Sequence, residues 1–174
     1  FHRAVVKVLT ARRFPSKLGY TGVDKTVKRA LRLKAMKRIK EMDFSMNPTF
    51  DFARDMFLMS FYTRGMSFVD LAYLRKKDLQ NGVLSYRRRK TGQQLFIKWE
   101  KCMQEIVDKY DTSQSNYLLP IIKPFGDIDE RTQYIYTAHN INRCLKIIGK
   151  ELGLSVSLTL YVARHAWASI AKSK

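Results

Sequence analysis

Three basic residues from separate parts of the chain have the chemistry of a phosphate clamp: Arg64, Lys90 and Arg164. Arginine can bind two phosphate oxygens at once and keeps its charge at any working pH, which suits stabilising a pentacovalent phosphoryl transition state. Lysine can instead give a proton to a leaving oxygen. Tyr161 lies three residues before Arg164, so the two side chains share a helix face and could meet the same phosphate.

The elements expected to position these residues are mainly helices. Apolar spacing predicts helices over residues 1–13, 33–43, 48–65, 67–74, 99–110, 138–152 and 161–172, with a loop over 111–133. Asn47 and Pro48 are a helix-start signal, and Ser67 with Asp70 resembles a capping box. Two strand-like runs, 82–86 and 94–98, predict a β-hairpin with Lys90 in its turn. The predicted fold class is mainly α with a small antiparallel β-sheet, which alone does not identify a function.

The charge balance predicts a polyanionic partner. The chain has 33 Lys and Arg against 15 Asp and Glu, a formal net charge of +18. Lysine and arginine cluster in the first forty positions and again over residues 75–90, where the candidate DNA-binding side chains are Lys76, Lys77, Arg87, Arg88 and Arg89. Such clusters neutralise phosphates and release counterions on nucleic acid. The three arginines are expected to alternate across a strand, with one or two of them reaching the DNA backbone. A solvated surface or a membrane-surface patch would also be basic, but so large an excess on a small chain favours nucleic acid.

Several other classes of protein are excluded. No apolar run approaches the roughly 20 residues that cross a bilayer, and the first residues do not resemble a signal peptide. We therefore expect a cytoplasmic protein. Cys102 and Cys144 lie in apolar helical patterns and are expected to be reduced core residues. The histidines are far apart and the acids are scattered, so no metal or cofactor is expected.

Several segments resemble the catalytic domain of the tyrosine recombinase (phage integrase) family. The stretch 158–168, with Arg164 and His165, is similar to the family's His-x-x-Arg-His box. Three further segments follow the family's order and approximate spacing: residues 63–71, residues 87–92 with their Lys-Thr-Gly turn, and residues 140–146, which include Arg143. Together they cover roughly residues 24–174, and the likeness is greatest to integrases of mobile elements in Bacteroidetes-type bacteria.

The resemblance implies a metal-free, site-specific DNA recombinase. A tyrosine attacks a phosphodiester and leaves a 3′-phosphotyrosine and a free 5′-hydroxyl, and a second 5′-hydroxyl reseals the strand without ATP. Arg164 would be the second arginine of the clamp, Lys90 the lysine that protonates the leaving oxygen, and His165 a histidine that helps to order Arg164. Arg143 would be a further DNA-binding residue. The implied partner is double-stranded DNA in a nucleoid, bound by a tetramer on paired sites, although this chain alone is expected to be a monomer.

The chain departs from the family's pattern at three places. Ser67 stands where the first catalytic arginine is expected, and Arg64, three residues earlier, is the candidate substitute. Tyr161 occupies the place of the catalytic histidine; a phenol can donate a hydrogen bond to phosphate but is a poor base near neutral pH. The nucleophilic tyrosine follows the arginine box by a few tens of residues in the family. We therefore expect a catalytic domain over 23–174 that lacks its C-terminal segment, preceded by the tail of a core-binding domain and a linker over 1–22, and we expect this chain to bind DNA without cleaving it.

Two other functions compete with the recombinase. A basic DNA-binding module without chemistry would explain the charge but not the ordered Arg, Lys-Thr-Gly and Arg-His segments. A metal-dependent nuclease would need clustered carboxylates, which the sequence does not show. Taken singly, Arg64 could be a surface arginine and Lys90 a solvated turn lysine. Tyr161 could itself be the nucleophile, but its place before Arg164 matches the family's histidine.

Overall fold

The computed structural model describes residues 31–124 and 127–173. Its elements are α2 (Leu33–Glu41), α3 (Pro48–Tyr62), α4 (Phe68–Ala72), the 3₁₀ helix η1 (Lys76–Asp78), β1 (Leu79–Gln80), β2 (Val83–Arg87), β3 (Gln94–Lys98), α5 (Lys101–Val107), α6 (Glu130–Glu151) and α7 (Leu160–Lys172). The expected fold class is confirmed. The helix expected over 1–13 and the domain tail expected over 1–22 lie outside the described residues.

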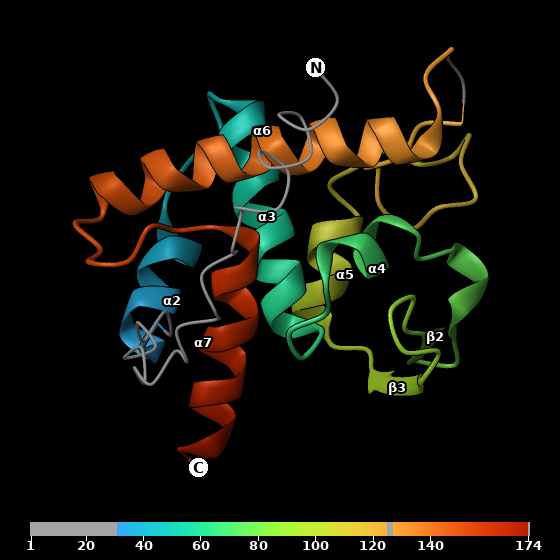
Figure 1. The fold of residues 1–174 in the computed structure, drawn as a ribbon, viewed down its shortest axis with the longest axis horizontal. Coiled ribbons are helices and arrows are strands. Elements are labelled where there is room, and N and C mark those ends of the chain that lie inside the picture. The colour runs from blue at the N-terminus through green and yellow to red at the C-terminus, as the bar shows by residue number, and fades with distance from the viewer. Residues whose placement is uncertain (1–30, 125–126, 174) are drawn as a thin grey trace, which may run out of the picture.

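Helix α3 runs through the centre of the fold. The Asn47 side chain accepts the Phe50 N–H at 3.3 Å and Pro48 is the first helical residue, so the expected start is confirmed. Every residue from Asp55 to Ser60 is buried, because α3 packs against α2, α5, α6 and α7. Figure 1 shows α7 running beside α3, with α6 crossing above both helices and the sheet on the opposite side from α2.

The sheet is antiparallel, with the strand order β1-β2-β3. The predicted hairpin is confirmed, with Leu84 opposite Ile97 and Ser85 opposite Phe96. Leu84 and Ile97 are buried on the inner face of the sheet, while Phe96 is exposed on the outer face. Strand β1 was not predicted, because two residues are too few to show an alternating pattern. The expectation that Arg87, Arg88 and Arg89 alternate across a strand is wrong, since β2 ends at Arg87 and the other two lie in the turn.

Helix α6 differs most from its prediction. It begins at Glu130, eight residues before the predicted start, so the expected loop over 111–133 is too long. The Asp129 side chain caps it by accepting the Thr132 N–H at 3.0 Å. Its first turns show no apolar stripe in the sequence because their side chains are half-buried or exposed, and they pack on α4 through the stacked rings of Tyr134 and Phe68.

The remaining elements agree with prediction to within about three residues, a usual uncertainty of helix ends. Helix α7 begins at Leu160, whose N–H donates to the Asn142 side-chain oxygen at 2.9 Å. Cys144 is buried and Cys102 half-buried, and both are free thiols. Within residues 31–124 and 127–173, no helix is long and apolar enough to cross a membrane, and no group of three His, Cys, Asp or Glu could hold a metal ion.

Candidate functional site

The turn after α3 brings Arg64 and Gly65 against α7. Both residues adopt left-handed backbone conformations, with φ of +61° and +74°, and the Gly65 N–H donates to Ser60 O at 2.9 Å. A Cβ on Gly65 would lie 3.1 Å from the Arg164 Cα and 3.2 Å from its Cγ. The glycine therefore permits a close approach between the turn and Arg164, while Arg64 itself is exposed.

Asp70 joins the start of α4 to the hairpin turn. The Ser67 hydroxyl accepts the Asp70 N–H at 3.3 Å and donates to Asp70 Oδ2 at 2.6 Å, so Ser67 is the helix cap that the sequence predicted. Asp70 is only 5% exposed, and its Oδ1 accepts the Arg89 N–H at 3.0 Å. In a full capping box this carboxylate would accept the Ser67 backbone N–H. Here it holds the backbone of the hairpin turn instead.

In the segment Arg87–Lys90, which we call the basic turn, the side chains of Arg87 and Arg89 contact neutral groups. Arg87 Nη1 donates to Gly92 O at 2.7 Å across the turn, and the Gly92 N–H donates to Arg88 O at 2.8 Å. The Arg89 guanidinium lies 3.9 Å from the centre of the Tyr73 ring, a cation–π contact. Lys90 lies exposed at the tip. Within residues 31–124 and 127–173 none of these side chains forms an ion pair with a carboxylate, so their charge remains available to an anion.

Tyr86 shows that the basic turn and α7 share one electrostatic environment. Burial raises the pKa of its phenol, and the charge of Asp70 acts in the same direction, while Arg88 and Arg164 lower the pKa. Two arginines from distant segments therefore act on one buried hydroxyl. The structure thus places the turn at Gly65 against Arg164, and both Arg164 and Arg88 lie close enough to Tyr86 to influence its phenol. That Arg64 and Lys90 join Arg164 at one phosphate stays a prediction.

Tyr161 and His165 form a pair on the first turns of α7. Tyr161 is 55% exposed, and its ring meets the His165 ring edge-to-face with centroids 4.4 Å apart. The His165 Nε2 is buried without a hydrogen-bond partner among the described residues. The contact orients Tyr161 at the surface beside Arg164, which is half-buried. That His165 orders Arg164 stays a prediction.

Two of the expected DNA-binding residues, Lys76 and Arg143, form side-chain hydrogen bonds with protein groups outside the basic turn. Lys76 Nζ donates to Thr112 O at 2.6 Å, and Arg143 donates to Asn140 Oδ1 at 2.9 Å on the exposed face of α6. Lys77 lies exposed at the edge of the cavity described next.

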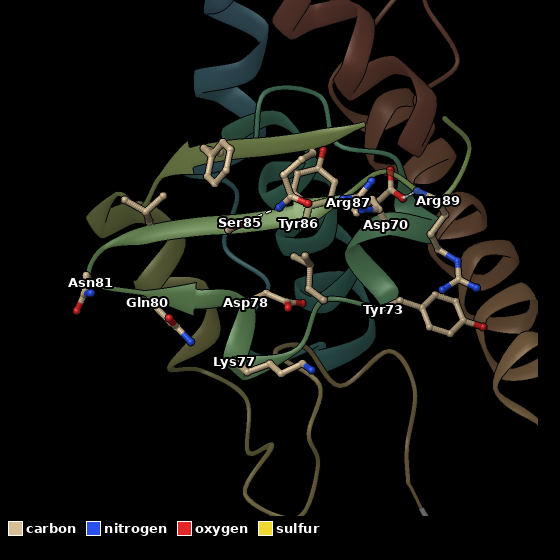
Figure 2. Close-up of a pocket in the computed structure, with 14 residues that line it drawn as sticks. Asp70, Tyr73, Lys77, Asp78, Gln80, Asn81, Ser85, Tyr86, Arg87 and Arg89 are labelled. Atoms are coloured by element: carbon tan, nitrogen blue, oxygen red, sulfur yellow. Dashed lines mark hydrogen bonds between the residues drawn. The ribbon is translucent and has the colours of Figure 1, made fainter. Parts of the chain in front are cut away.

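A cavity of about 760 Å³ lies over the outer face of the sheet and α4. Figure 2 shows Arg89 and Tyr73 at one end and Asn81 at the other, with Lys77 below the strands. Its two acids face backbone donors, since Asp70 accepts the Arg89 N–H and Asp78 accepts the Arg75 N–H at 2.8 Å. The cavity therefore presents its cations to solvent more freely than its carboxylates.

Sequence reasoning treated Asp70 as a cap and did not single out Tyr73 or Phe96. An isolated acid in a basic segment was a usable signal for Asp70. The partners of the two aromatic residues depend on how α4 and the sheet pack, which the sequence pattern does not contain.

No protein-family model matches the chain, and no curated protein matches it. Among solved structures, XerA recombinase is 19% identical, with a TM-score of 0.53 over 83% of this chain and 51% of that one. A lambda integrase tetramer bound to a Holliday junction is 16% identical, with a TM-score of 0.50 over 83% of this chain and 43% of that one. A lambda integrase dimer bound to a COC′ core site is 17% identical, with a TM-score of 0.50 over 99% of this chain and 62% of that one. The chain thus has a fold similar to the tyrosine recombinase catalytic domain and spans about half the length of these proteins.

Proposed function

We propose that the chain is the catalytic part of a tyrosine-type DNA recombinase that binds duplex DNA and clamps one scissile phosphate. The observation that carries the proposal is the close approach of Gly65 to Arg164, beside an arginine-rich turn that acts on the same buried phenol. The contact joins two segments far apart in the sequence, and an arginine of a third segment influences the same phenol as Arg164. The fold is similar to that of integrases solved on DNA. A chain that was merely basic would not need its cations at one place.

In the proposed reaction each cation has a separate task. Arg164 and Arg64 hold the non-bridging oxygens and stabilise the negative charge of the pentacovalent transition state. A tyrosine hydroxyl attacks phosphorus, the bond to the 5′-oxygen breaks, and Lys90 gives that oxygen its proton. The product is a 3′-phosphotyrosine and a 5′-hydroxyl. Attack by a 5′-hydroxyl on the phosphotyrosine reverses the step and rejoins DNA without ATP or a metal.

Tyr161 takes the place of a histidine in this proposal and acts as a hydrogen-bond donor to the phosphate. Its exposure leaves the hydroxyl free to reach DNA, and the edge contact with His165 fixes the ring. We propose that the nucleophile is another tyrosine, outside these 174 residues. The chain should then bind DNA without forming a covalent adduct, and an adduct that disappears in Tyr161→Phe would identify Tyr161 as the nucleophile.

Trapping on a nicked suicide substrate tests the clamp in the natural protein that contains these residues. We expect Arg164→Ala and Lys90→Ala to lose strand cleavage, by roughly 10³-fold or more for the arginine, while most DNA affinity remains. Lys101→Ala is the matched control, because Lys101 is exposed and, in the part of the chain that the structure describes, its only ion pair is with the exposed Glu105. Near-normal cleavage by Arg164→Ala would refute the clamp.

Arg64 needs a separate test because Ser67 stands at the position of the family's arginine. If Arg64→Ala cleaves as well as the unaltered protein, another cation supplies the first arginine's charge. The alternative function, a non-catalytic DNA-binding domain, is favoured by the fact that Ser67 is already used as a helix cap. Absence of cleavage together with intact DNA binding in the natural protein would support that alternative.

The wider biological setting is also proposed. A recombinase of this kind would integrate or excise a mobile element in the cytoplasm, on the nucleoid, as a tetramer on paired DNA sites. The fold neighbours include a tetramer and a dimer on DNA. The 174 residues alone are expected to be monomeric, which sedimentation analysis with and without DNA would test.

A further inference from the structure

The outer face of the three-stranded sheet carries an aromatic ring that is largely exposed. Phe96, in the middle of β3, is 64% exposed, and Val83 on β2 is 39% exposed. Pairing places Phe96 opposite Ser85, whose small side chain leaves the ring uncovered. A single exposed apolar residue is ordinary, but this one borders the cavity that also holds Tyr73 and a set of cations.

The cavity combines the three chemistries that recognise a nucleotide. Phe96 offers an aromatic face, and the cations Lys77, Arg87 and Arg89 offer phosphate contacts. The amide side chains of Gln80 and Asn81 offer hydrogen bonds to base edges, while the Gln94 amide N–H already donates to Ser85 Oγ at 2.8 Å. Its volume, about 760 Å³, is in the range of pockets that take a small organic ligand, so it suits roughly one or two nucleotides.

The cations of this cavity are held in place but not neutralised. Arg87 is anchored on Gly92 O and Arg89 on the Tyr73 ring, and none of the ion pairs among the described residues includes either arginine or Lys77. Figure 2 shows Arg89 extended beside Tyr73, with the polar side chains of Gln80 and Asn81 toward the other end. Positive charge near an exposed aromatic ring, here that of Phe96, is the arrangement that binds unpaired nucleic acid.

We propose that this outer sheet face binds single-stranded DNA, with a base stacked on Phe96 and the backbone phosphates on Arg87, Arg89 and Lys77. A single strand is favoured over a duplex because the faces of paired bases are already covered by their neighbours, whereas an unpaired base can stack on a sheet aromatic. The choice of DNA over RNA rests on the proposed function, in which strand cleavage frees a DNA end.

Fluorescence anisotropy with labelled oligothymidylate tests the stacking contact. Phe96→Ala should weaken binding about 5- to 150-fold, equivalent to about 1–3 kcal/mol for one stacked base. Phe96→Leu stays apolar but lacks a ring and should lose as much, while Phe96→Tyr should bind normally. The matched control is Tyr136→Ala, which removes an aromatic residue of equal exposure, 65%, from α6.

Charge variants test the phosphate contacts separately. For the single strand, Lys77→Gln and Arg89→Gln should each reduce the salt dependence of binding by roughly 0.7 in the log–log slope, and Lys101→Gln should leave it unchanged. Normal oligothymidylate binding by both Phe96→Ala and Phe96→Leu would overturn the proposal, as would equal losses in Tyr136→Ala. Tighter binding of oligouridylate than oligothymidylate would refute the choice of DNA. Duplex binding by this chain, and strand cleavage by the natural protein that contains it, should not change in Phe96→Ala, so failure here is distinguishable from failure of the recombinase proposal.

Discussion

Replacing Gly65 with alanine tests whether the turn after α3 and Arg164 are in direct contact. The added Cβ would lie 3.1 Å from the Arg164 Cα and 3.2 Å from its Cγ. The Cα belongs to the helix backbone, which cannot rotate away as the end of a side chain can. Either the turn or the first turns of α7 must therefore move by a few tenths of an ångström.

Two costs add in this variant. Alanine in the left-handed conformation costs about 1–2 kcal/mol, and overpacking of a tight site costs about 1–3 kcal/mol more. Gly82→Ala separates them, because Gly82 has nearly the same φ, +72°, but a Cβ there meets nothing within 4 Å. The difference between the two variants isolates the contact with Arg164, and we expect it to be about 1–3 kcal/mol.

Urea denaturation measures this difference, provided that the m-value is the same in all variants. Combining Gly65→Ala with Arg164→Ala should recover part of the loss, since the second change removes Cγ but leaves Cα and Cβ. A coupling free energy of about 0.5 kcal/mol or more is expected for residues in contact. If Gly65→Ala costs no more than Gly82→Ala, the turn does not touch Arg164 and the argument for the clamp loses its basis.

Three further predictions concern the groups that hold the fold and the site. Asp70→Asn should lower the free energy of unfolding by about 1–3 kcal/mol, because the hydrogen bonds from the Ser67 hydroxyl and the Arg89 N–H lose their charged acceptor. Hydrogen exchange at the Arg89 amide should become faster. An unchanged exchange rate would contradict the role given to Asp70. Asp55→Asn should lower the free energy of unfolding by about 3–5 kcal/mol in the same denaturation assay, since this buried carboxylate binds Arg54, Lys109 and the Tyr110 hydroxyl. The comparison is the exposed ion pair of Lys101 and Glu105, where Glu105→Gln should cost at most about 1 kcal/mol. Burial raises the pKa of Tyr62 from 10.0 to about 12, so the contribution of this phenol to stability is full below pH 10 and is lost as the pH rises toward 12. An ultraviolet titration of Tyr62→Phe should show one phenol fewer ionising near pH 12 than the unaltered protein. Identical titration curves would contradict the raised pKa.

The parts of the fold that sequence predicted are those set by local chemistry. Asn47 and Pro48 start α3 through one hydrogen bond and one ring, and the hairpin follows from alternation around a turn. Helix α6 was predicted too short because a helix turn without buried side chains shows no apolar period. Its start at Glu130 depends on the Asp129 cap and on Tyr134 packing against α4, which are not visible in a hydrophobicity pattern.

The candidate site also has residues that the sequence indicates and contacts that it does not. Arg64, Lys90 and Arg164 could be proposed from residue type and order. The contact of Gly65 with Arg164, and the hydrogen bond from the Arg89 N–H to Asp70 19 residues earlier, could not. Phe96 could be placed on a strand from the sequence, and its exposure became known only from the register that sets Ser85 opposite. Pairwise contacts between elements are therefore the information that sequence patterns lacked.

The partners of the cations indicate which of them can bind phosphate. On α3 and after α5, Arg54 and Lys109 are neutralised by Asp51 and Asp55, so binding an anion there would require breaking ion pairs. In the basic turn the guanidinium of Arg87 is held by a carbonyl oxygen and that of Arg89 by an aromatic ring. These neutral partners restrict the side chains without cancelling their charge, which lowers the entropy lost when an anion binds and leaves the electrostatic attraction intact. Basic side chains thus stabilise the fold through ion pairs beside Asp51 and Asp55, and in the basic turn they keep a charge that an anion can bind.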